Sequence, residues 1–139
     1  MTGLAQVQAL LAAGKQPPIG ETLAFALVEV ASGHAVFEGV PDRRAYNPLG
    51  TIHGGYAATL LDSACGIATH SALAEGQSYT TLELKIAYHR AMTENTGPVR
   101  ATGTVVSIGR RVAFAEAKLT DAEGRLLASA TSTLLVISQ

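Results

Sequence analysis

Residues 53–74 read HGGYAATLLDSACGIATHSALA, and this stretch decides the fold. It is rich in helix-forming residues and contains no proline, which predicts one long helix. Apolar side chains, among them Leu60, Leu61 and Ile67, fall around nearly its whole circumference. A helix that is apolar on all sides is usually buried on most of them. At about 1.5 Å per residue it would be roughly 30 Å long, which is long for so small a chain.

Strand patterns flank this helix on both sides. Residues 22–31 and 34–40 predict a hairpin that turns at Ser32-Gly33. After the helix, strands are predicted over residues 78–90, 99–108, 111–120 and 125–137. The last three follow one another through short connections, so they should pair antiparallel. A short helix is also expected over residues 3–13, which makes residues 1–20 an N-terminal helix and lead-in.

These elements predict an α+β fold. A helix buried on most sides needs a sheet that curls around it. That is the hotdog fold, in which an antiparallel sheet of about six strands wraps a long central helix. The alternative is a generic α+β sandwich with the helix on one face, but the missing polar face of the helix favours the wrapped arrangement. The chain has 139 residues and no linker or repeat, so we expect one domain over residues 1–139.

The composition excludes several classes of function. The net charge of −1 leaves no broad basic surface for nucleic acid. No apolar run approaches the roughly 18 residues that span a membrane, and residues 1–15 lack the basic start of a signal peptide. The single Cys65 excludes an internal disulfide and fits a reducing, cytoplasmic compartment. The four histidines are scattered and show no metal-ligand spacing.

The segment before the long helix and one acid inside it carry the candidate chemistry. Asn47 stands in an Asn-x-x-Gly pattern, residues 53–55 read His-Gly-Gly, and Asp62 follows within the helix. This spacing, with the Gly-Arg-Arg-Val-Ala-Phe stretch at residues 109–114, resembles the hotdog-fold acyl-CoA thioesterases of the PaaI-like type. These are similar to the phenylacetate-pathway and 4-hydroxybenzoyl-CoA thioesterases. The resemblance covers about residues 22–137 and implies hydrolysis of an acyl- or aryl-CoA thioester to the free acid and coenzyme A.

The glycines at the helix start are suited to binding a thioester carbonyl. The first N–H groups of a helix have no partner within it and lie at the positive end of its dipole. Gly54 and Gly55 carry no Cβ, so a substrate can approach their amides closely. Such an amide stabilises the developing oxyanion, typically by about 2.7–4 kcal/mol. The alternative is that the two glycines only permit tight passage of the chain beneath the sheet.

Asp62 is costly in an apolar helix unless it is paired or used. The alternative to a catalytic role is an exposed acid on a thin polar strip, or an acid that only accepts a structural hydrogen bond. Under the resemblance it is either a general base acting on water or the nucleophile itself, and the sequence leaves both open. It stands eight residues after Gly54, about 12 Å along a helix. Donor and attacking group must each lie within about 3–3.5 Å of the reacting atoms. Either the two groups do not cooperate, or Gly54 comes from a second copy of the chain.

The resemblance implies the second of these arrangements, a two-fold dimer with two sites at its interface. Asn47, His53, Gly54 and Gly55 would come from one protomer and Asp62 from the other. Pairing of two dimers into a tetramer is left open. The charged fraction of only 15% fits a surface that is partly used as an interface.

Three supporting residues have alternative explanations. Asn47 either hydrogen-bonds the thioester or the attacking water, or only makes an Asx-turn in its loop. His53, at the positive end of a helix, is expected to be neutral and to orient the loop rather than act as a base. Thr81 matches the position where the resembled family carries a Ser or Thr near the acid. Alternation over residues 78–90 places Leu82 on the helix-facing side and Thr81 on the other, which a bulge or an edge position at the dimer seam could reconcile.

The remaining candidates concern coenzyme A and the thiol. Arg90, Arg110 and Arg111 are the candidate contacts for the phosphates of coenzyme A, with solvated surface charge as the equal alternative. Cys65 has no evident activating group and is expected in the core. Coenzyme A is part of the substrate and the thioester is already activated, so no metal or cofactor is expected.

Two other functions stay open at this stage. A hotdog enoyl-CoA hydratase or dehydratase needs a His–acid pair, which His53 and Asp62 could form only across a dimer. A non-catalytic acyl-CoA-binding module needs the pocket but not Asp62. The sequence does not identify the acyl group.

Overall fold

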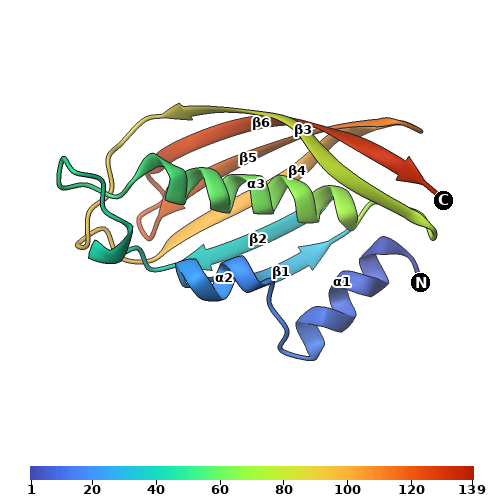
Figure 1. Ribbon diagram of the computed structural model, residues 1–139, viewed down its shortest axis with the longest axis horizontal. Coiled ribbons are helices and arrows are strands. Elements are labelled where there is room, and N and C mark those ends of the chain that lie inside the picture. Colours follow the sequence, from blue (N-terminus) through green and yellow to red (C-terminus); the bar gives the residue numbers. More distant parts are fainter.

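The computed structural model describes residues 1–139 as a six-stranded antiparallel sheet with one long helix, α3, along one of its faces (Figure 1). The strand order is β1-β2-β4-β5-β6-β3, so β1 and β3 form the two edges. The strands are β1 (Phe25–Ala31), β2 (His34–Gly39), β3 (Gln77–Tyr88), β4 (Val99–Ile108), β5 (Val112–Asp121) and β6 (Leu126–Ser138). The helices are α1 (Gly3–Ala12), α2 (Pro18–Leu23) and α3 (Gly54–His70), with a short 3₁₀ helix at Arg43–Ala45. The predicted hotdog fold is confirmed.

The long helix is buried on most of its circumference, as the sequence predicted. Nine of the 17 residues of α3 are buried, and beyond Gly55 none is fully exposed. The helix lies close to the sheet because the residues between them are small. Ala57, Ala64 and Ala68 have no exposed surface, and a Cβ on Gly103 of β4 would meet the backbone carbonyl of Ala64.

The helix α2 was not predicted. The sequence pattern predicts a strand from residue 22, whereas in the structure residues 22 and 23 end a helix and β1 begins at Phe25. Pro18 occupies the first position of α2, where its missing N–H costs nothing and its fixed φ suits a helix. Ala24 then ends the helix in the left-handed conformation, with φ 57°. Six residues are too few for a helical period to show in the sequence.

The helix predicted over residues 53–74 ends earlier, at His70. The side chain of Ser71 gives the reason. Its hydroxyl donates to the carbonyl of Ala68 at 2.7 Å and accepts from the N–H of Gly33, in the β1–β2 turn, at 2.9 Å. The end of α3 is therefore fixed by a contact with a distant hairpin.

A bulge in β3 changes which of its residues face α3. The pairing of β3 with β6 shifts register between Thr81 and Glu83. A bulge adds one residue to one strand and so switches the side of every residue beyond it. Leu82, which alternation had placed against the helix, is 56% exposed, so that prediction was wrong. Tyr79 and Thr81 lie on the α3 side before the bulge, and Leu84 packs on the core after it.

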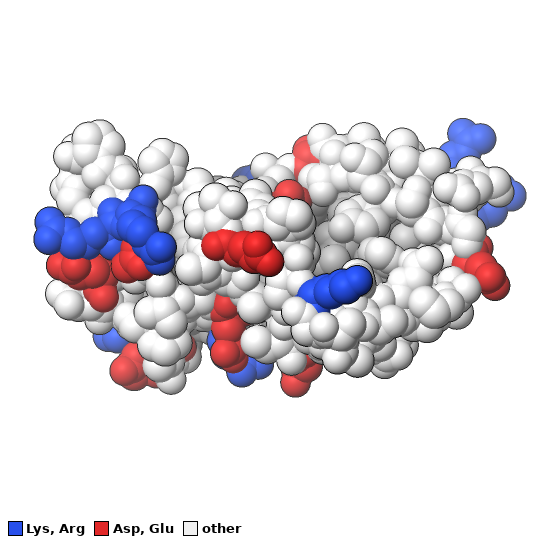
Figure 2. Space-filling model, turned by 60° about the horizontal axis from the view of Figure 1, so that its bottom comes forward, with Lys and Arg blue, Asp and Glu red and all other residues white.

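The N-terminal helix docks on the far end of α3. The N–H of Gly3 donates to the carbonyl of Leu73 at 3.1 Å, and Gln6 Oε1 bonds His70 Nε2 at 2.9 Å. Charged side chains on the face shown in Figure 2 form small groups separated by wide uncharged areas. None of the helices is both long and apolar enough to cross a membrane.

Candidate active site

The N-terminus of α3 presents one free amide. His53 caps the helix, and its Nδ1 accepts a hydrogen bond from the N–H of Gly55 at 2.7 Å. This contact requires a ring whose Nδ1 carries no proton. The N–H of Gly54 makes no hydrogen bond within the chain. Of the two predicted oxyanion donors, Gly54 has its amide free within the chain, whereas the amide of Gly55 is bound to His53.

Tyr88, the last residue of β3, holds the helix start in place. Its hydroxyl donates to the carbonyl of Gly54 at 2.7 Å. A Cβ on Gly54 would lie 2.9 Å from the same hydroxyl oxygen, so this close packing depends on glycine. Sequence reasoning counted Tyr88 only as an apolar strand residue and missed this contact.

A surface cavity of about 520 Å³ opens beside the free amide. Its lining comes from the loop before α3, the first turn of α3 and the segment around the end of β3. His53, Gly54 and Arg90 all contribute to it, so one predicted phosphate contact lies at the helix start. Asn47 and Asp62 are not part of the lining.

Asn47 organises the loop that leads into α3. Its Oδ1 accepts from the N–H groups of Leu49 and Thr51, at 2.9 and 3.2 Å. Its Nδ2 donates to the hydroxyl of Thr51 at 2.9 Å. This is the loop turn that was the alternative to substrate contact. The loop that Asn47 holds includes Thr51, which lines the cavity.

Asp62 and Thr81 meet between α3 and β3. The Thr81 hydroxyl donates to Asp62 Oδ1 at 3.0 Å, in partly buried surroundings. The bulge in β3 makes this contact possible because it lets Thr81 face the helix. The second carboxylate oxygen, Oδ2, makes no hydrogen bond within the chain. The structure thus brings two predicted site residues together and leaves one oxygen of the acid available.

The free amide and the acid do not meet within one chain. Gly54 and Asp62 lie eight residues apart on the same straight helix, about 12 Å at the standard rise. The cavity beside Gly54 does not extend to Asp62. Each chain therefore carries two separated halves of the predicted site.

Tyr79 is a polar neighbour of Asp62 that sequence reasoning missed. Its hydroxyl packs against Gly66, one helical turn beyond Asp62, where a Cβ would lie 2.9 Å from the oxygen. Burial raises the pKa of Tyr79, and the negative charge of Asp62 acts in the same direction. The sequence does hold a signal for this placement. Tyr79 and Thr81 are two residues apart in a strand, so their side chains point to the same side.

Cys65 is buried, as expected. Burial raises the pKa of its thiol to about 12, and the charges of Asp62 and Glu116 add to the effect. Because the thiolate is the reactive form, Cys65 is unreactive near neutral pH.

The other two predicted phosphate contacts lie elsewhere. Arg110 and Arg111, in the β4–β5 connection, line a separate surface cavity of about 330 Å³ with Val136 and Ser138. One chain therefore does not bring them together with Arg90.

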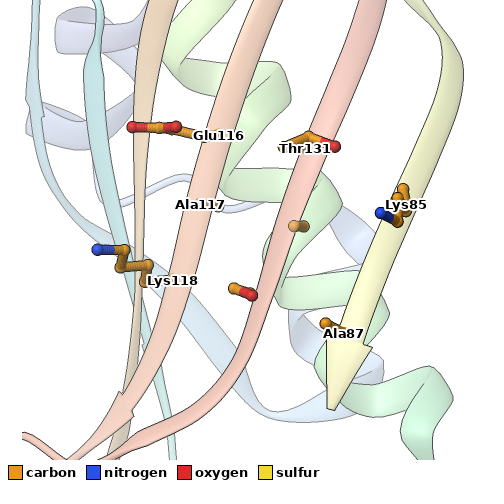
Figure 3. Close-up of a pocket in the computed structure, with 8 residues that line it drawn as sticks. Lys85, Ala87, Glu116, Ala117, Lys118 and Thr131 are labelled. Atoms are coloured by element: carbon orange, nitrogen blue, oxygen red, sulfur yellow. The ribbon is translucent and has the colours of Figure 1, made fainter. Parts of the chain in front are cut away.

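A shallow depression of about 230 Å³ lies on the sheet face turned away from α3 (Figure 3). Lys85, Glu116, Lys118 and Thr131 contribute to it, from β3, β5 and β6. The sheet separates this depression from α3 and hence from Asp62. It is not part of the candidate active site.

Known proteins resemble this chain in sequence and in structure. The thioesterase superfamily matches residues 49–128, which include α3 and β3. The 1,4-dihydroxy-2-naphthoyl-CoA hydrolase of Listeria monocytogenes is 29% identical over 84% of this chain and 93% of its own length. A variant of the phenylacetic acid degradation protein PaaI from Thermus thermophilus is 29% identical, with a TM-score of 0.77 over 86% of this chain and 98% of that chain. A Streptococcus mutans protein solved with acetyl-CoA is 27% identical, with a TM-score of 0.75 over 83% and 90%.

Proposed function

Because the chain belongs to the thioesterase superfamily, we propose that it hydrolyses acyl- or aryl-CoA thioesters to the free acid and coenzyme A. The resemblance to PaaI-like thioesterases is confirmed, and the protein is a thioester hydrolase. The relatives support coenzyme A as the thiol, since one is named for a naphthoyl-CoA and another was solved with acetyl-CoA. The reaction needs no metal or cofactor, because a thioester is already activated and coenzyme A arrives as part of the substrate.

The observation that carries this proposal is the pair of free groups on α3. The N–H of Gly54 has no partner in the chain and lies at the positive end of the helix dipole. There it binds the thioester carbonyl oxygen and stabilises the negative charge that develops on it. Asp62, held through Oδ1 by Thr81, has Oδ2 free to activate water or to attack the carbonyl carbon.

Two chains complete the site in this proposal. Because Gly54 and Asp62 are about 12 Å apart along α3, Gly54 of one protomer acts with Asp62 of the other. Two surfaces are available for the partner chain. One is the partly buried stripe of α3 that carries Asp62, and the other is the open edge of β3. A two-fold dimer then has two equivalent sites. Measuring the mass in solution distinguishes this dimer from a monomer and from a dimer of dimers.

Arginines recognise the phosphates of coenzyme A in the proposed complex. Arg90 lies at the cavity beside Gly54. Arg110 and Arg111 lie at a different surface of the same chain. In a two-fold dimer, they can approach the nucleotide from the chain that does not supply Arg90.

The test is release of free thiol from a panel of aryl, short, medium and long acyl-CoA esters, followed with Ellman's reagent. Asp62→Asn keeps an oxygen for Thr81 but removes the charge, and it should lower kcat by about 10²–10⁴-fold with the oligomer intact. Asp42→Asn is the matched control, since Asp42 pairs with Arg44 on an exposed loop. Turnover by Asp62→Asn equal to that of the control would contradict the assignment.

The same panel tests the alternatives. A hydratase would consume an enoyl-CoA without releasing thiol, and a binding module would retain acyl-CoA without consuming it. The contact between His53 Nδ1 and the Gly55 amide occupies the nitrogen nearest the helix start. It therefore gives no support to the His–acid pair that hydration requires.

A further inference from the structure

Two oxygens, one on β3 and one on the side of α3 that faces it, lack hydrogen-bond partners in the chain. One is Asp62 Oδ2, since only Oδ1 is bound by Thr81. The other is the hydroxyl of Tyr79, which makes no hydrogen bond although its ring is largely enclosed. The only fully buried side-chain polar atom without a partner is the Tyr56 hydroxyl. The Tyr79 hydroxyl therefore reaches solvent and can bind a molecule from it.

Three features of the structure place the Tyr79 side chain. Gly66, one turn beyond Asp62 on the same side of α3, leaves room for it: a Cβ there would lie 2.9 Å from the oxygen and 3.2 Å from the ring. His70, one further turn along, meets the ring edge to face, with centroids 5.7 Å apart. The bulge after Thr81 keeps Tyr79 and Thr81 on the helix side. The phenol oxygen therefore lies against the helical turn that follows Asp62.

The Tyr79 hydroxyl is a hydrogen-bond donor at neutral pH. Burial raises its pKa, and the negative charge of Asp62 raises it further, so the proton stays on the oxygen. A neutral phenol does not compete with Asp62 as a base. It can donate to a water molecule that itself donates to the carboxylate.

Building on the proposed function, we propose that Tyr79 is a further catalytic residue, whose hydroxyl and Asp62 Oδ2 together hold the attacking water. The water donates one hydrogen to Oδ2 and accepts from the Tyr79 hydroxyl, leaving a lone pair for the thioester carbonyl carbon. As the C–O bond forms, Asp62 takes the proton and the oxyanion rests on the partner's Gly54 amide. The C–S bond then breaks, and the proton leaves on the sulfur of coenzyme A. This arrangement makes Asp62 a base rather than the nucleophile.

Tyr79→Phe tests the proposal because it removes the hydroxyl and keeps the ring between Gly66 and His70. It should lower kcat by about tenfold to a hundredfold, as misplacement of a reacting group does, and leave KM within about twofold. An unchanged kcat would overturn the proposal, and so would a change confined to KM, which would indicate contact with the acyl group instead. Thermal unfolding followed by circular dichroism checks that the variant is folded.

Two substitutions of Gly66, one with a hydroxyl and one without, test the role of the hydroxyl further. In the Tyr79→Phe background, Gly66→Ser offers a new hydroxyl one turn from Asp62, while Gly66→Ala adds only the methyl carbon. Partial recovery of kcat with Gly66→Ser but not with Gly66→Ala supports a role for the hydroxyl. Equal responses to the two substitutions would overturn it. Gly66→Ala alone provides a second route, since its Cβ displaces the phenol oxygen and should lower kcat with the tyrosine still present.

Failure of this inference is distinguishable from failure of the proposed function. If the wild-type protein releases thiol and Asp62→Asn does not, the proposed function stands even when Tyr79→Phe is fully active. If the wild-type protein releases no thiol from any ester, both are overturned.

Discussion

Exchange of subunits between two defective variants tests the shared site most directly. Gly54→Pro deletes the free N–H, and its Cβ also crowds the Tyr88 hydroxyl. Position 54 is the first of the helix, where proline is favoured. The residue before it, His53, has φ −58° and ψ 136°, which is the conformation that precedes proline. Gly54→Ala is the control, because it adds bulk beside Tyr88 but keeps the N–H. Gly54→Pro should lower kcat by about 10²–10³-fold.

The expected recovery follows from the geometry of a two-fold dimer. Homodimers of Gly54→Pro lack the amide at both sites, and homodimers of Asp62→Asn lack the acid at both. In a mixed dimer, the Asp62→Asn chain supplies an intact Gly54 and the Gly54→Pro chain supplies an intact Asp62. One site then has both groups and the other has neither. Random pairing makes half of the dimers mixed, so the mixture should show about a quarter of wild-type kcat per site.

Two different affinity tags allow the activity of the mixed dimer to be measured on its own. Co-expressed chains with different tags allow the mixed dimer to be purified on both, and it should release thiol at about half the wild-type rate. Mixed dimers no more active than either parent would refute the shared site. Full activity of a monomer at low concentration would refute it as well.

Three further predictions concern the fold and its titrating groups. Gly103→Ala should destabilise the protein by about 1–3 kcal/mol, because the new Cβ meets the α3 backbone at Ala64; an unchanged midpoint in chemical denaturation would contradict the close helix–sheet approach. Cys65, whose pKa burial raises to about 12, should resist Ellman's reagent until the protein unfolds; rapid labelling of the native protein would show that the thiol is accessible. Burial alone would raise the pKa of Asp121, but hydrogen bonds from the Arg125 backbone and guanidinium outweigh it and lower the pKa. Its carboxylate therefore stabilises the fold above the unfolded pKa of about 3.9, and this is lost as pH falls through the folded value. Asp121→Asn should lower the melting temperature at neutral pH but not in strong acid, and an equal difference at both would count against this ion pair.

The long helix and the number of strands could be predicted because each leaves a regular pattern in the sequence. Apolar residues surround α3, and alternation marks the strands. The bulge in β3 leaves no such trace, since one added residue shifts the side of everything beyond it without changing composition. Alternation alone therefore placed both Thr81 and Leu82 on the wrong side.

Some features of the candidate site could likewise be predicted from the sequence, and others could not. Gly54 and Asp62 could be proposed because the resemblance points to them, and because an unpaired helix amide and an acid in an apolar helix each have a physical cost or use. The contacts of Tyr88 with Gly54 and of Tyr79 with Gly66 could not. They join segments far apart in the sequence, one through a hydrogen bond and the other through close packing, and a tyrosine in a strand is ordinarily a packing residue. The sequence also could not decide which glycine amide His53 would occupy.

The small residues between α3 and the sheet restrict how this protein can be engineered or diversify. Ala57 and Ala64 of the helix lie buried against a sheet whose β4 and β5 contribute buried alanines at positions 101, 113, 115 and 117. A binding site inside a core is widened by replacing large side chains with small ones, and these alanines offer only methyl groups to remove. Laboratory selection for longer or bulkier acyl groups should therefore accumulate substitutions on the partly buried stripe of α3 and along the edge of β3, and leave these alanines unchanged.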